Sequence, residues 1–268
     1  MAKQQLVTLS SDFGLQDGYV GMMKGAIACI DPSLAVIDVT HDIPPQNLIA
    51  ARFCLLNAYP YFPEGTVHVA VVDPGVGSER RAVAIELADG FLVGPDNGIF
   101  SGILNRVPAK AAVELTHPQY WRSRSASSTF HGRDIFAPVG AYLASGTPLA
   151  RLGRTIDPAT LVELPLPEVE TTANGLNGCI QYIDRFGNAI ANIPAATVAG
   201  KRWTVALGDR LIPSGTTYSD VCAGEAIALI GSHGWVEVAV NGGSAQSILQ
   251  LDWHSRVKII FQEDSFLQ

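Results

Sequence analysis

Apolar and polar positions recur along the chain with two different patterns, which divide it near residue 160. In the first part, short β-branched runs alternate with longer stretches whose apolar positions follow the helical repeat. We predict strands over 6–10, 34–39, 66–72, 82–87, 91–93 and 111–115, and helices over 18–30, 47–59, 98–105 and 134–145. This β-α-β-α order predicts an α/β domain with a mostly parallel sheet and helices on its faces.

The last of these helices has recognisable ends. Pro138 falls in its first turn, where the loss of a backbone N–H costs little, and Gly146 is placed to end it. Asp134 stands where a carboxylate favours the helix N-terminus, so we predict a capping role for it.

The second part has a different pattern. Residues 161–169 (LVELPLPEV) alternate prolines with apolar residues, which is typical of an extended linker. Short β-like runs follow at 175–183, 203–207, 226–231, 236–240 and 257–261, separated by turn signals. We therefore expect an N-terminal α/β domain over 1–160, a linker over 161–172 and a smaller C-terminal β-barrel or sandwich over 173–268.

Composition narrows the possible partners. Hydrophobic residues make up 47% of the chain and charged residues 16%, and the net charge is −7. An acidic chain without a Lys or Arg run is not expected to bind nucleic acid or an anionic membrane.

No stretch is apolar enough for a signal peptide or a membrane span, so we expect the protein in the cytoplasm. Four widely separated cysteines among apolar neighbours predict buried, reduced thiols rather than disulfides or metal ligands.

Two polar segments directly follow predicted strands. Asp12 lies in SSDFG, at the carboxyl end of the first strand, where α/β sheets bind ligands. It suits either a ribose diol or an N-cap or Asx turn. In VDPGVGSERR, Asp73 and an arginine seven residues later, Arg80, suit a charge-assisted pair that keeps the carboxylate ionised, although a surface ion pair is the alternative.

Two further regions carry candidate chemistry. His131, in TFHGRDIF, stands beside a glycine at a helix entrance and can orient or exchange protons near neutral pH. In the β-rich part, the segments DRFGN, SHGW and VNGG offer groups for an amino acid, and Phe186 offers a ring for a purine. Hairpin turns explain these last three segments equally well.

Taken together and in this order, the segments resemble one family. From SSDFG through VDPGVGSERR, GPDNGIF and TFHGRDIFAP to DRFGN, GSHGW and NGGSA, the chain resembles the S-adenosyl-L-methionine hydroxide adenosyltransferases, relatives of fluorinating and chlorinating enzymes. This resemblance implies a larger α/β domain, a smaller C-terminal β-barrel and a homotrimer. Its active sites are then expected between the N-terminal domain of one subunit and the C-terminal domain of the next.

The resemblance also implies roles for individual residues. The catalytic set maps onto Asp73, Arg80 and His131, with Arg81 adjacent and the choice between the two arginines left open. Substrate-binding roles fall on Asp12 for the ribose, on Asp184, Asn188 and Ser232 for the methionine part, on Phe186 and Tyr218 near the adenine, and on Asn241. At one position the match fails, because His233 stands where the family branch has an arginine, and the holder of the methionine carboxylate stays open.

The expected reaction is attack of water on the 5′ carbon of S-adenosyl-L-methionine, releasing adenosine and methionine. The halogenating relatives have Tyr in place of Asp73 and of His131, and the fluorinating branch has Ser in place of Gly132, which favours water here. Because a sulfonium leaves readily, no metal or cofactor is expected, and positioning and desolvating one water suffices. The alternatives are a halide-using adenosyltransferase and a non-catalytic sensor of S-adenosyl-L-methionine or adenosine.

Overall fold

The computed structural model describes residues 6–262. The chain forms two compact units, Met1–Leu164 and Pro165–Gln268, which we call the N-terminal and C-terminal units. Their boundary falls inside the stretch 161–172 that the proline pattern marks as a linker.

The N-terminal unit is built on a seven-stranded sheet of order β2-β1-β3-β5-β4-β6-β7. Its strands are β1 Leu6–Ser11, β2 Ala35–Thr40, β3 Thr66–Val71, β4 Ala82–Glu86, β5 Gly90–Pro95, β6 Ala111–Glu114 and β7 Arg154–Ile156. Strands β2, β1, β3 and β5 pair in parallel, whereas β5, β4, β6 and β7 pair antiparallel. The α/β class is confirmed. The sheet is more mixed than the element order predicts, because the short 87–89 connection has room only for a hairpin between β4 and β5.

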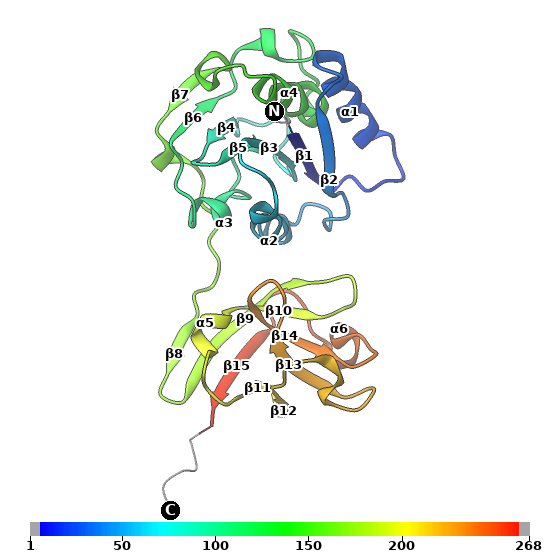
Figure 1. Ribbon diagram of the computed structural model, residues 1–268, viewed down its shortest axis with the longest axis vertical. Helices are drawn as coiled ribbons and strands as arrows, with labels where there is room; N and C mark the ends of the chain where they lie inside the picture. Colours follow the sequence, from blue (N-terminus) through cyan, green and yellow to red (C-terminus); the bar gives the residue numbers. More distant parts are fainter. Residues whose placement is uncertain (1–5, 263–268) are drawn as a thin grey trace, which may run out of the picture. The chain divides into compact units, whose positions relative to one another are not determined.

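Helices cover both faces of this sheet. In Figure 1, α1 and α4 lie on one side and α2 and α3 on the other. Their bounds are α1 Tyr19–Ile30, α2 Leu48–Ala58, α3 Ser101–Leu104 and α4 Ala137–Ala144, with short turns η1 Tyr59–Tyr61, η2 Pro118–Tyr120, η4 Leu149–Arg151 and η5 Pro158–Thr160. A π-helical turn, η3 Gly132–Phe136, precedes α4. Pro138 lies in the first turn of α4, and Gly146 follows its end with a φ of 91°, as predicted.

The core of this unit lies between the parallel strands and the helices α1 and α4. Val7, Leu9, Val67 and Val69 project from β1 and β3 and are fully buried. Because these strands have helices on both faces, both of their sides are buried, and the positions that alternate with the valines and leucine include the buried polar residues Thr8, Ser10 and His68. Strand β1 is accordingly buried along its whole length.

The C-terminal unit is an antiparallel, nearly closed barrel, and the β-barrel prediction is confirmed. Its strands are β8 Glu170–Thr172, β9 Gly175–Ile183, β10 Ala189–Pro194, β11 Trp203–Leu207, β12 Arg210–Pro213, β13 Ala226–Ile230, β14 Trp235–Val240 and β15 Arg256–Phe261, with helices α5 Ala195–Val198, α6 Ala245–Leu249 and η6 Tyr218–Asp220. The strand order is β12-β11-β15-β9-β10-β14-β13, and β8 pairs with β9. An isolated bridge from Ser214 to Ala228 links the two ends of this order.

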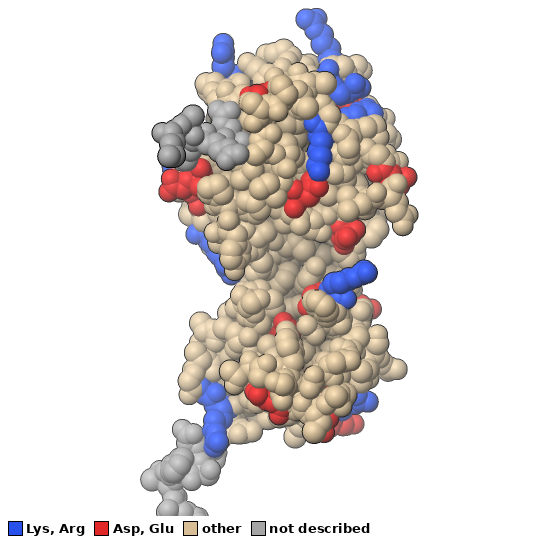
Figure 2. Space-filling model, turned by 45° about the vertical axis from the view of Figure 1, so that its right-hand side comes forward, with Lys and Arg blue, Asp and Glu red and all other residues tan. Residues whose placement is uncertain are grey.

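The surface bears on two of the sequence predictions. On the face shown in Figure 2, Lys and Arg side chains are scattered among Asp and Glu rather than gathered into one basic patch. Within residues 6–262, no helix is long and apolar enough to span a membrane. The prediction of buried thiols is wrong for Cys29 and Cys222, which are exposed, because apolar neighbours in sequence do not share their side of the fold.

Close packing between α4 and β3 depends on Gly140. A Cβ at Gly140 would lie 2.5 Å from Cγ2 of Val69, and Val69 is fully buried. We expect Gly140→Ala to lower the free energy of unfolding by about 1–3 kcal/mol, measured by urea denaturation, because the core must shift to admit the methyl group. Gly25→Ala in α1 is the matched control: no atom lies within 4 Å of its Cβ. It should stabilise by up to about 1 kcal/mol through helix propensity. Equal effects of the two substitutions would contradict this packing.

Candidate active site

The sheet brings four predicted site residues to one edge. Asp12 directly follows β1 and Asp73 follows β3, and these strands are parallel neighbours whose last residues, Ser11 and Val71, are in register. Arg80 precedes β4, whose first residue Ala82 pairs with the last residue of β5. Because β4 runs antiparallel, its start lies at the carboxyl ends of the parallel strands, the edge where α/β folds bind ligands.

His131 reaches the same edge from the loop before η3. This loop packs on the Asp73 loop through Gly77, which has a φ of 78°. A Cβ at Gly77 would lie 2.3 Å from the Ser128 carbonyl oxygen, so only glycine permits this contact between the two loops. His131 is the residue immediately before the π-helical turn, a local feature that is frequent at functional sites.

Arg80 joins Asp73 and His131 into one hydrogen-bonded group. Its Nε donates to Asp73 Oδ1 at 2.9 Å and Oδ2 at 3.0 Å, and its Nη2 donates both to Asp73 Oδ2 and to His131 Nδ1, the latter at 2.7 Å. The side chains of Arg80 and Asp73 are only 11% and 5% exposed. The pair is therefore a buried, forked ion pair rather than the surface pair that the sequence left open.

The arrangement fixes the protonation state of His131. A guanidinium only donates hydrogen bonds, so Nδ1 must accept and the proton of the neutral ring lies on Nε2. Burial, and then the positive charge of Arg80, lower the pKa of His131 below its ordinary value of 6.5. His131 is consequently neutral at pH 7 and presents an N–H donor at Nε2.

Arg81 points to a different partner, and of the two arginines it is Arg80 that contacts Asp73. Its Nε donates to Asp96 Oδ2 at 2.8 Å and its Nη1 to Thr160 Oγ1 at 3.0 Å. Asp96 also accepts from the backbone N–H of Val162 at 2.8 Å. Arg81 thus ties the end of β5 to residues 160–162 and contributes nothing to the Asp73–His131 group.

A cavity of 390 Å³ opens beside this group. Asp12, Asp73 and His131 line it, as does Gly132, together with residues that the sequence reasoning did not single out: Phe13, Tyr19, Pro45, Gln46, Val71, Pro74, Val76, Thr129 and Phe130. One Asp12 oxygen accepts from the backbone N–H of Gln46 at 2.8 Å. The site therefore combines a carboxylate for hydroxyl groups, a neutral imidazole and a largely apolar wall.

The apolar wall is an aromatic cluster of Phe13, Tyr19 and Phe130. Their ring centroids are 5.3–5.9 Å apart, with Phe130 edge-on to both other rings. Each of these residues is ordinary in its own segment, and only the tertiary fold joins them. The one sequence signal is that Phe13 and Phe130 adjoin the predicted site residues Asp12 and His131.

The capping role predicted for Asp134 is wrong. Asp134 is buried and accepts from Arg133 Nε at 2.7 Å, Arg122 Nε at 2.8 Å and the backbone N–H of Ser127 at 2.8 Å. Its charge holds the 122–129 loop, because Arg122 and the backbone N–H of Ser127 from that loop both donate to it. This loop leads directly to Phe130 and His131.

In the C-terminal unit, Asp184, Phe186 and Asn188 form one turn between β9 and β10. Asp184 Oδ1 accepts from the backbone N–H groups of Phe186 and Asn188, both at 2.9 Å, and Asn188 Nδ2 donates to Asp184 Oδ2 at 3.0 Å. The ring of Phe186 is 77% exposed at the tip of this turn. The backbone here forms a hairpin turn, which the sequence left as an alternative. This turn leaves the large ring of Phe186 uncovered.

Tyr218 belongs to a second polar group of this unit. Its hydroxyl donates to Glu237 Oε1 at 2.8 Å, and His233 Nε2 lies 3.1 Å from Glu237 Oε2. Burial and this hydrogen bond raise the pKa of Tyr218 to about 12, and the charge of Asp184 contributes to the same shift. Tyr218 and Asp184 therefore lie near one another, and the His233 ring is turned toward a buried glutamate.

The two remaining predicted residues of this unit, Ser232 and Asn241, lie outside these two groups. Ser232 is exposed in the turn before β14. Asn241, directly after β14, donates to the Val221 carbonyl at 2.8 Å, so its amide N–H serves the local fold. Nothing in the described hydrogen bonds joins Ser232 or Asn241 to the Asp184 turn.

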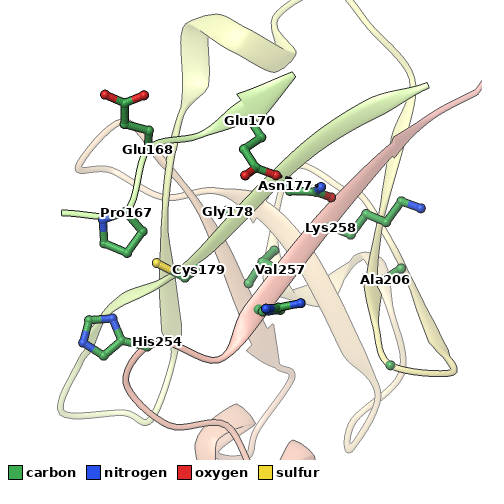
Figure 3. Close-up of a pocket in the computed structure, with 12 residues that line it drawn as sticks. Pro167, Glu168, Glu170, Asn177, Gly178, Cys179, Ala206, His254, Val257 and Lys258 are labelled. Carbon is green, nitrogen blue, oxygen red and sulfur yellow. Dashed lines mark hydrogen bonds between the residues drawn. The ribbon is translucent and has the colours of Figure 1, made fainter. Parts of the chain in front are cut away.

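A larger hollow of 650 Å³ lies elsewhere on the barrel, over β9 and β15. Figure 3 shows Glu168, Glu170, Asn177, Cys179, His254 and Lys258 around it. None of the predicted site residues lines it, and its acidic and basic side chains converge on no common point. We therefore place the chemistry at the smaller cavity beside Asp73.

Comparisons with known proteins agree along nearly the whole chain. Residues 7–153 match the family model for the SAM hydroxide adenosyltransferase N-terminal domain, and residues 178–258 match the C-terminal domain of the same family. An (R)-S-adenosyl-L-methionine hydrolase from Salinispora tropica is 41% identical over 97% of this chain and 99% of its own. Its counterpart from Thermus thermophilus is 43% identical over 93% of this chain and 97% of its own.

More distant relatives and solved structures extend the comparison. A fluorinase from Actinopolyspora mzabensis is 26% identical over 89% of this chain and 91% of its own. The crystal structure of a conserved protein from Thermotoga maritima matches with a TM-score of 0.89 and 32% identity, covering 95% of this chain and 99% of that one. The crystal structure of a conserved protein from Thermus thermophilus matches with a TM-score of 0.79 and 39% identity, covering 97% of this chain and 100% of that one.

The buried Asp134 predicts an acid-sensitive loop. Hydrogen bonds from Arg133 and Arg122 outweigh burial and hold the pKa of Asp134 far below its ordinary value near 4. Its stabilising contribution is therefore complete above pH 4 and is lost as the pH falls below 4 toward the lowered pKa. We expect Asp134→Asn to cost about 1–3 kcal/mol of unfolding free energy at neutral pH.

Urea denaturation near neutral pH and at acid pH measures this effect. The difference between Asp134→Asn and the unchanged protein should narrow under acid conditions, because protonation removes the same charge. Asp157→Asn, an exposed cap of η5, is the control and should show little effect at either pH. A difference for Asp134→Asn that stays constant with pH would contradict the assignment.

Proposed function

The chain belongs to the S-adenosyl-L-methionine hydroxide adenosyltransferase family of enzymes, and we propose that it hydrolyses S-adenosyl-L-methionine to adenosine and L-methionine through Asp73, Arg80 and His131. The observation that carries the proposal is the single guanidinium nitrogen, Arg80 Nη2, that donates to both Asp73 and His131 beside a cavity. A carboxylate and a neutral imidazole held together in this way suit the orientation of one water molecule.

Each group has a distinct task in the proposed reaction. Asp73 has lone pairs beyond those used by Arg80, and it accepts a proton of the attacking water. His131 donates from Nε2 and holds the water oxygen in place, and Arg80 keeps both groups in register. As the O–C5′ bond forms, the C5′–S bond breaks and its electron pair returns to sulfur, which becomes the neutral thioether of methionine.

Water exclusion and charge recognition come from the cavity wall. The cluster of Phe13, Tyr19 and Phe130 removes solvent from around the reacting water. Aromatic faces also attract a substrate cation such as a sulfonium. Asp12 accepts hydrogen bonds from the ribose hydroxyl groups. Because the sulfonium already leaves readily, the proposed reaction requires neither a metal nor a cofactor.

The C-terminal unit supplies the other half of the proposed site. Asp184, Asn188 and Ser232 are assigned to the methionine part, and Phe186 and Tyr218 to the adenine, with Asn241 beside them. The exposed ring of Phe186 is compatible with this assignment, because its faces are free to stack on a purine. We propose that the two halves meet across the interfaces of a homotrimer. The cytoplasmic location stays a prediction.

Water is favoured over halide by the space at Gly132. A Cβ there would lie 3.3 Å from Met23 Sδ, 3.3 Å from Phe130 Cε2 and 3.4 Å from Phe13 Cε2. A serine side chain at this position therefore requires the aromatic wall to move. Gly132 provides no serine hydroxyl. The Asp73 carboxylate would also repel an anionic nucleophile such as a halide.

Product analysis of two matched variants tests the proposal. We expect Asp73→Asn to lower kcat for adenosine release by about 10²–10⁴-fold, because the proton acceptor is lost. Asp96→Asn is the control: Asp96 is equally buried and pairs with the adjacent Arg81, so kcat should stay within a few fold. Chromatography of adenosine and methionine measures both rates.

Other results of the same assay would point elsewhere. Normal adenosine release by Asp73→Asn would contradict the role of this carboxylate. Substrate that stays intact for hours beside stoichiometric unchanged protein would support a sensor. A 5′-halo-adenosine formed in the presence of chloride or fluoride would support the halide-using reaction.

The protonation state of His131 predicts the acid limb of the pH profile. The pKa of His131 lies below 6.5, so the ring is mainly neutral at pH 7 and becomes protonated as the pH falls below 6.5. Protonation at Nδ1 would remove the acceptor for Arg80. We therefore expect kcat/KM, which reports the free enzyme, to change little near neutrality and to fall with a midpoint below pH 6.5.

A substitution identifies the group responsible for this limb. His131→Asn keeps an acceptor for Arg80 but has no titrating ring, so its residual activity should lack the limb. A midpoint above pH 6.5, or an identical limb in His131→Asn, would contradict the assignment.

A further inference from the structure

Beside Asp12, a row of polar side chains runs from the buried Ser11 to the surface. Ser11 Oγ and His41 Nδ1 are 2.7 Å apart, and His41 Nε2 lies 3.2 Å from Asp38 Oδ1. Lys24 Nζ donates to Asp38 Oδ2 at 2.6 Å. Ser11 is fully buried and His41 is 3% exposed, whereas Lys24 and Asp38 lie at the surface end of the row.

The Asp38 carboxylate sets the direction of the hydrogen bonds in this row. Its position beside His41 Nε2 favours a ring proton on that nitrogen and leaves Nδ1 as the acceptor. Ser11 Oγ then accepts from the backbone N–H of Phe13 at 3.3 Å and donates to His41 Nδ1. Nε2 makes no regular hydrogen bond within the described residues, so the nearby negative charge of Asp38 is what compensates for its burial.

This row is unsuited to nucleophilic catalysis although it contains a serine, a histidine and an aspartate. The Ser11 hydroxyl has no exposure to solvent and does not line the cavity. Asp38 faces the other nitrogen of His41, as in a catalytic triad, but it is paired with Lys24 at the surface. The row therefore has a structural role, and it connects a surface ion pair to the end of β1.

His41 also joins the two loops that carry the polar rim of the cavity. Its backbone carbonyl accepts from Gly14 N at 2.8 Å, while its side chain holds Ser11, so it binds the chain on both sides of Asp12. Asp12 in turn accepts from the backbone N–H of Gln46, whose φ of 62° is unusual for a residue other than glycine. Segments 11–14 and 41–46 are thus fixed to one another around the Asp12 carboxylate.

We propose that His41 is a positioning residue for the reaction, which sets the Asp12 carboxylate for the ribose hydroxyl groups through Ser11 and the Gly14 backbone. This inference rests on the proposed function, in which Asp12 binds the ribose. His41 touches no substrate. Its effect is on binding of the nucleoside part, and Asp38 and Lys24 hold its ring from the surface side.

His68 provides a matched control beside the same strand, β1. It is also buried, at 5% exposure, and its Nδ1 lies 2.9 Å from the Thr8 hydroxyl of β1. Thr8 is in mid-strand, and His68 does not line the cavity. Replacing either histidine removes a buried imidazole and one hydroxyl contact to β1, but only His41 is connected to Asp12.

Calorimetric binding of adenosine, together with steady-state hydrolysis, tests the inference. We expect His41→Ala to raise Kd for adenosine and KM for S-adenosyl-L-methionine by about tenfold, the loss typical of one hydrogen bond to a charged group, with a smaller change in kcat. His41→Asn places an amide near the position of Nδ1 and should restore most of the affinity. His68→Ala should leave both values within about twofold, since unrelated sites act independently.

A surface variant keeps the test decisive if His41→Ala does not fold. Asp38→Asn removes only the charge opposite His41 Nε2 and should raise Kd for adenosine by a few fold. An unchanged Kd in the folded His41 variants and in Asp38→Asn would overturn the inference, as would an equal loss in His68→Ala. Absence of hydrolysis by the unchanged protein would instead count against the proposed function, and the adenosine titration would still test His41.

Discussion

One nitrogen atom organises the proposed site. Arg80 Nη2 carries two hydrogens, and it gives one to the Asp73 carboxylate and one to the His131 ring. A lysine in this position would be a flexible point charge, whereas the planar guanidinium fixes the angle between its partners. The same contact makes Nδ1 of His131 an acceptor, so the identity of the proton donor, Nε2, follows from Arg80 rather than from the histidine.

The fold supplies the three side chains from two connections at one end of the sheet. Parallel pairing of β1 and β3 puts Asp12 and Asp73 at the same edge, and Arg80 stays there because it lies on the same connection as Asp73, directly before β4. The contact of Gly77 with Ser128, and the ionic anchoring of the 122–129 loop by Asp134, then hold His131 against this edge. Much of the irregular structure around the site therefore serves to hold His131 beside Asp73 and Arg80.

The sequence predicts the parts of this arrangement that depend on local order. Strand β3 is evident from its alternation, and with it the place of Asp73 at a strand end. The choice between Arg80 and Arg81 is not predictable, because their directions are set by a loop with two glycines whose path depends on tertiary contacts. Asp134 shows the same limit: its position suggests a helix cap, while the partner that ties it to the 122–129 loop, Arg122, lies twelve residues away.

In the barrel, the strands that the sequence missed are those with weak alternation. Strand β10 contains Asn192 and ends at Pro194, and its register shifts against both neighbours. The aromatic wall of the cavity was likewise not predictable, since Phe13, Tyr19 and Phe130 meet only in the folded unit. Family resemblance supplies the substrate, and the structure supplies the geometry on which the proposed tasks of Asp73, Arg80 and His131 rest.

The most direct measurement follows the oxygen of the attacking water. Hydrolysis of S-adenosyl-L-methionine in oxygen-18 water, with mass spectrometry of both products, shows which carbon is attacked. Attack at C5′ places one labelled oxygen in the 5′-hydroxyl of adenosine and none in methionine. Unlabelled adenosine, or 5′-methylthioadenosine as the nucleoside product, would contradict the account.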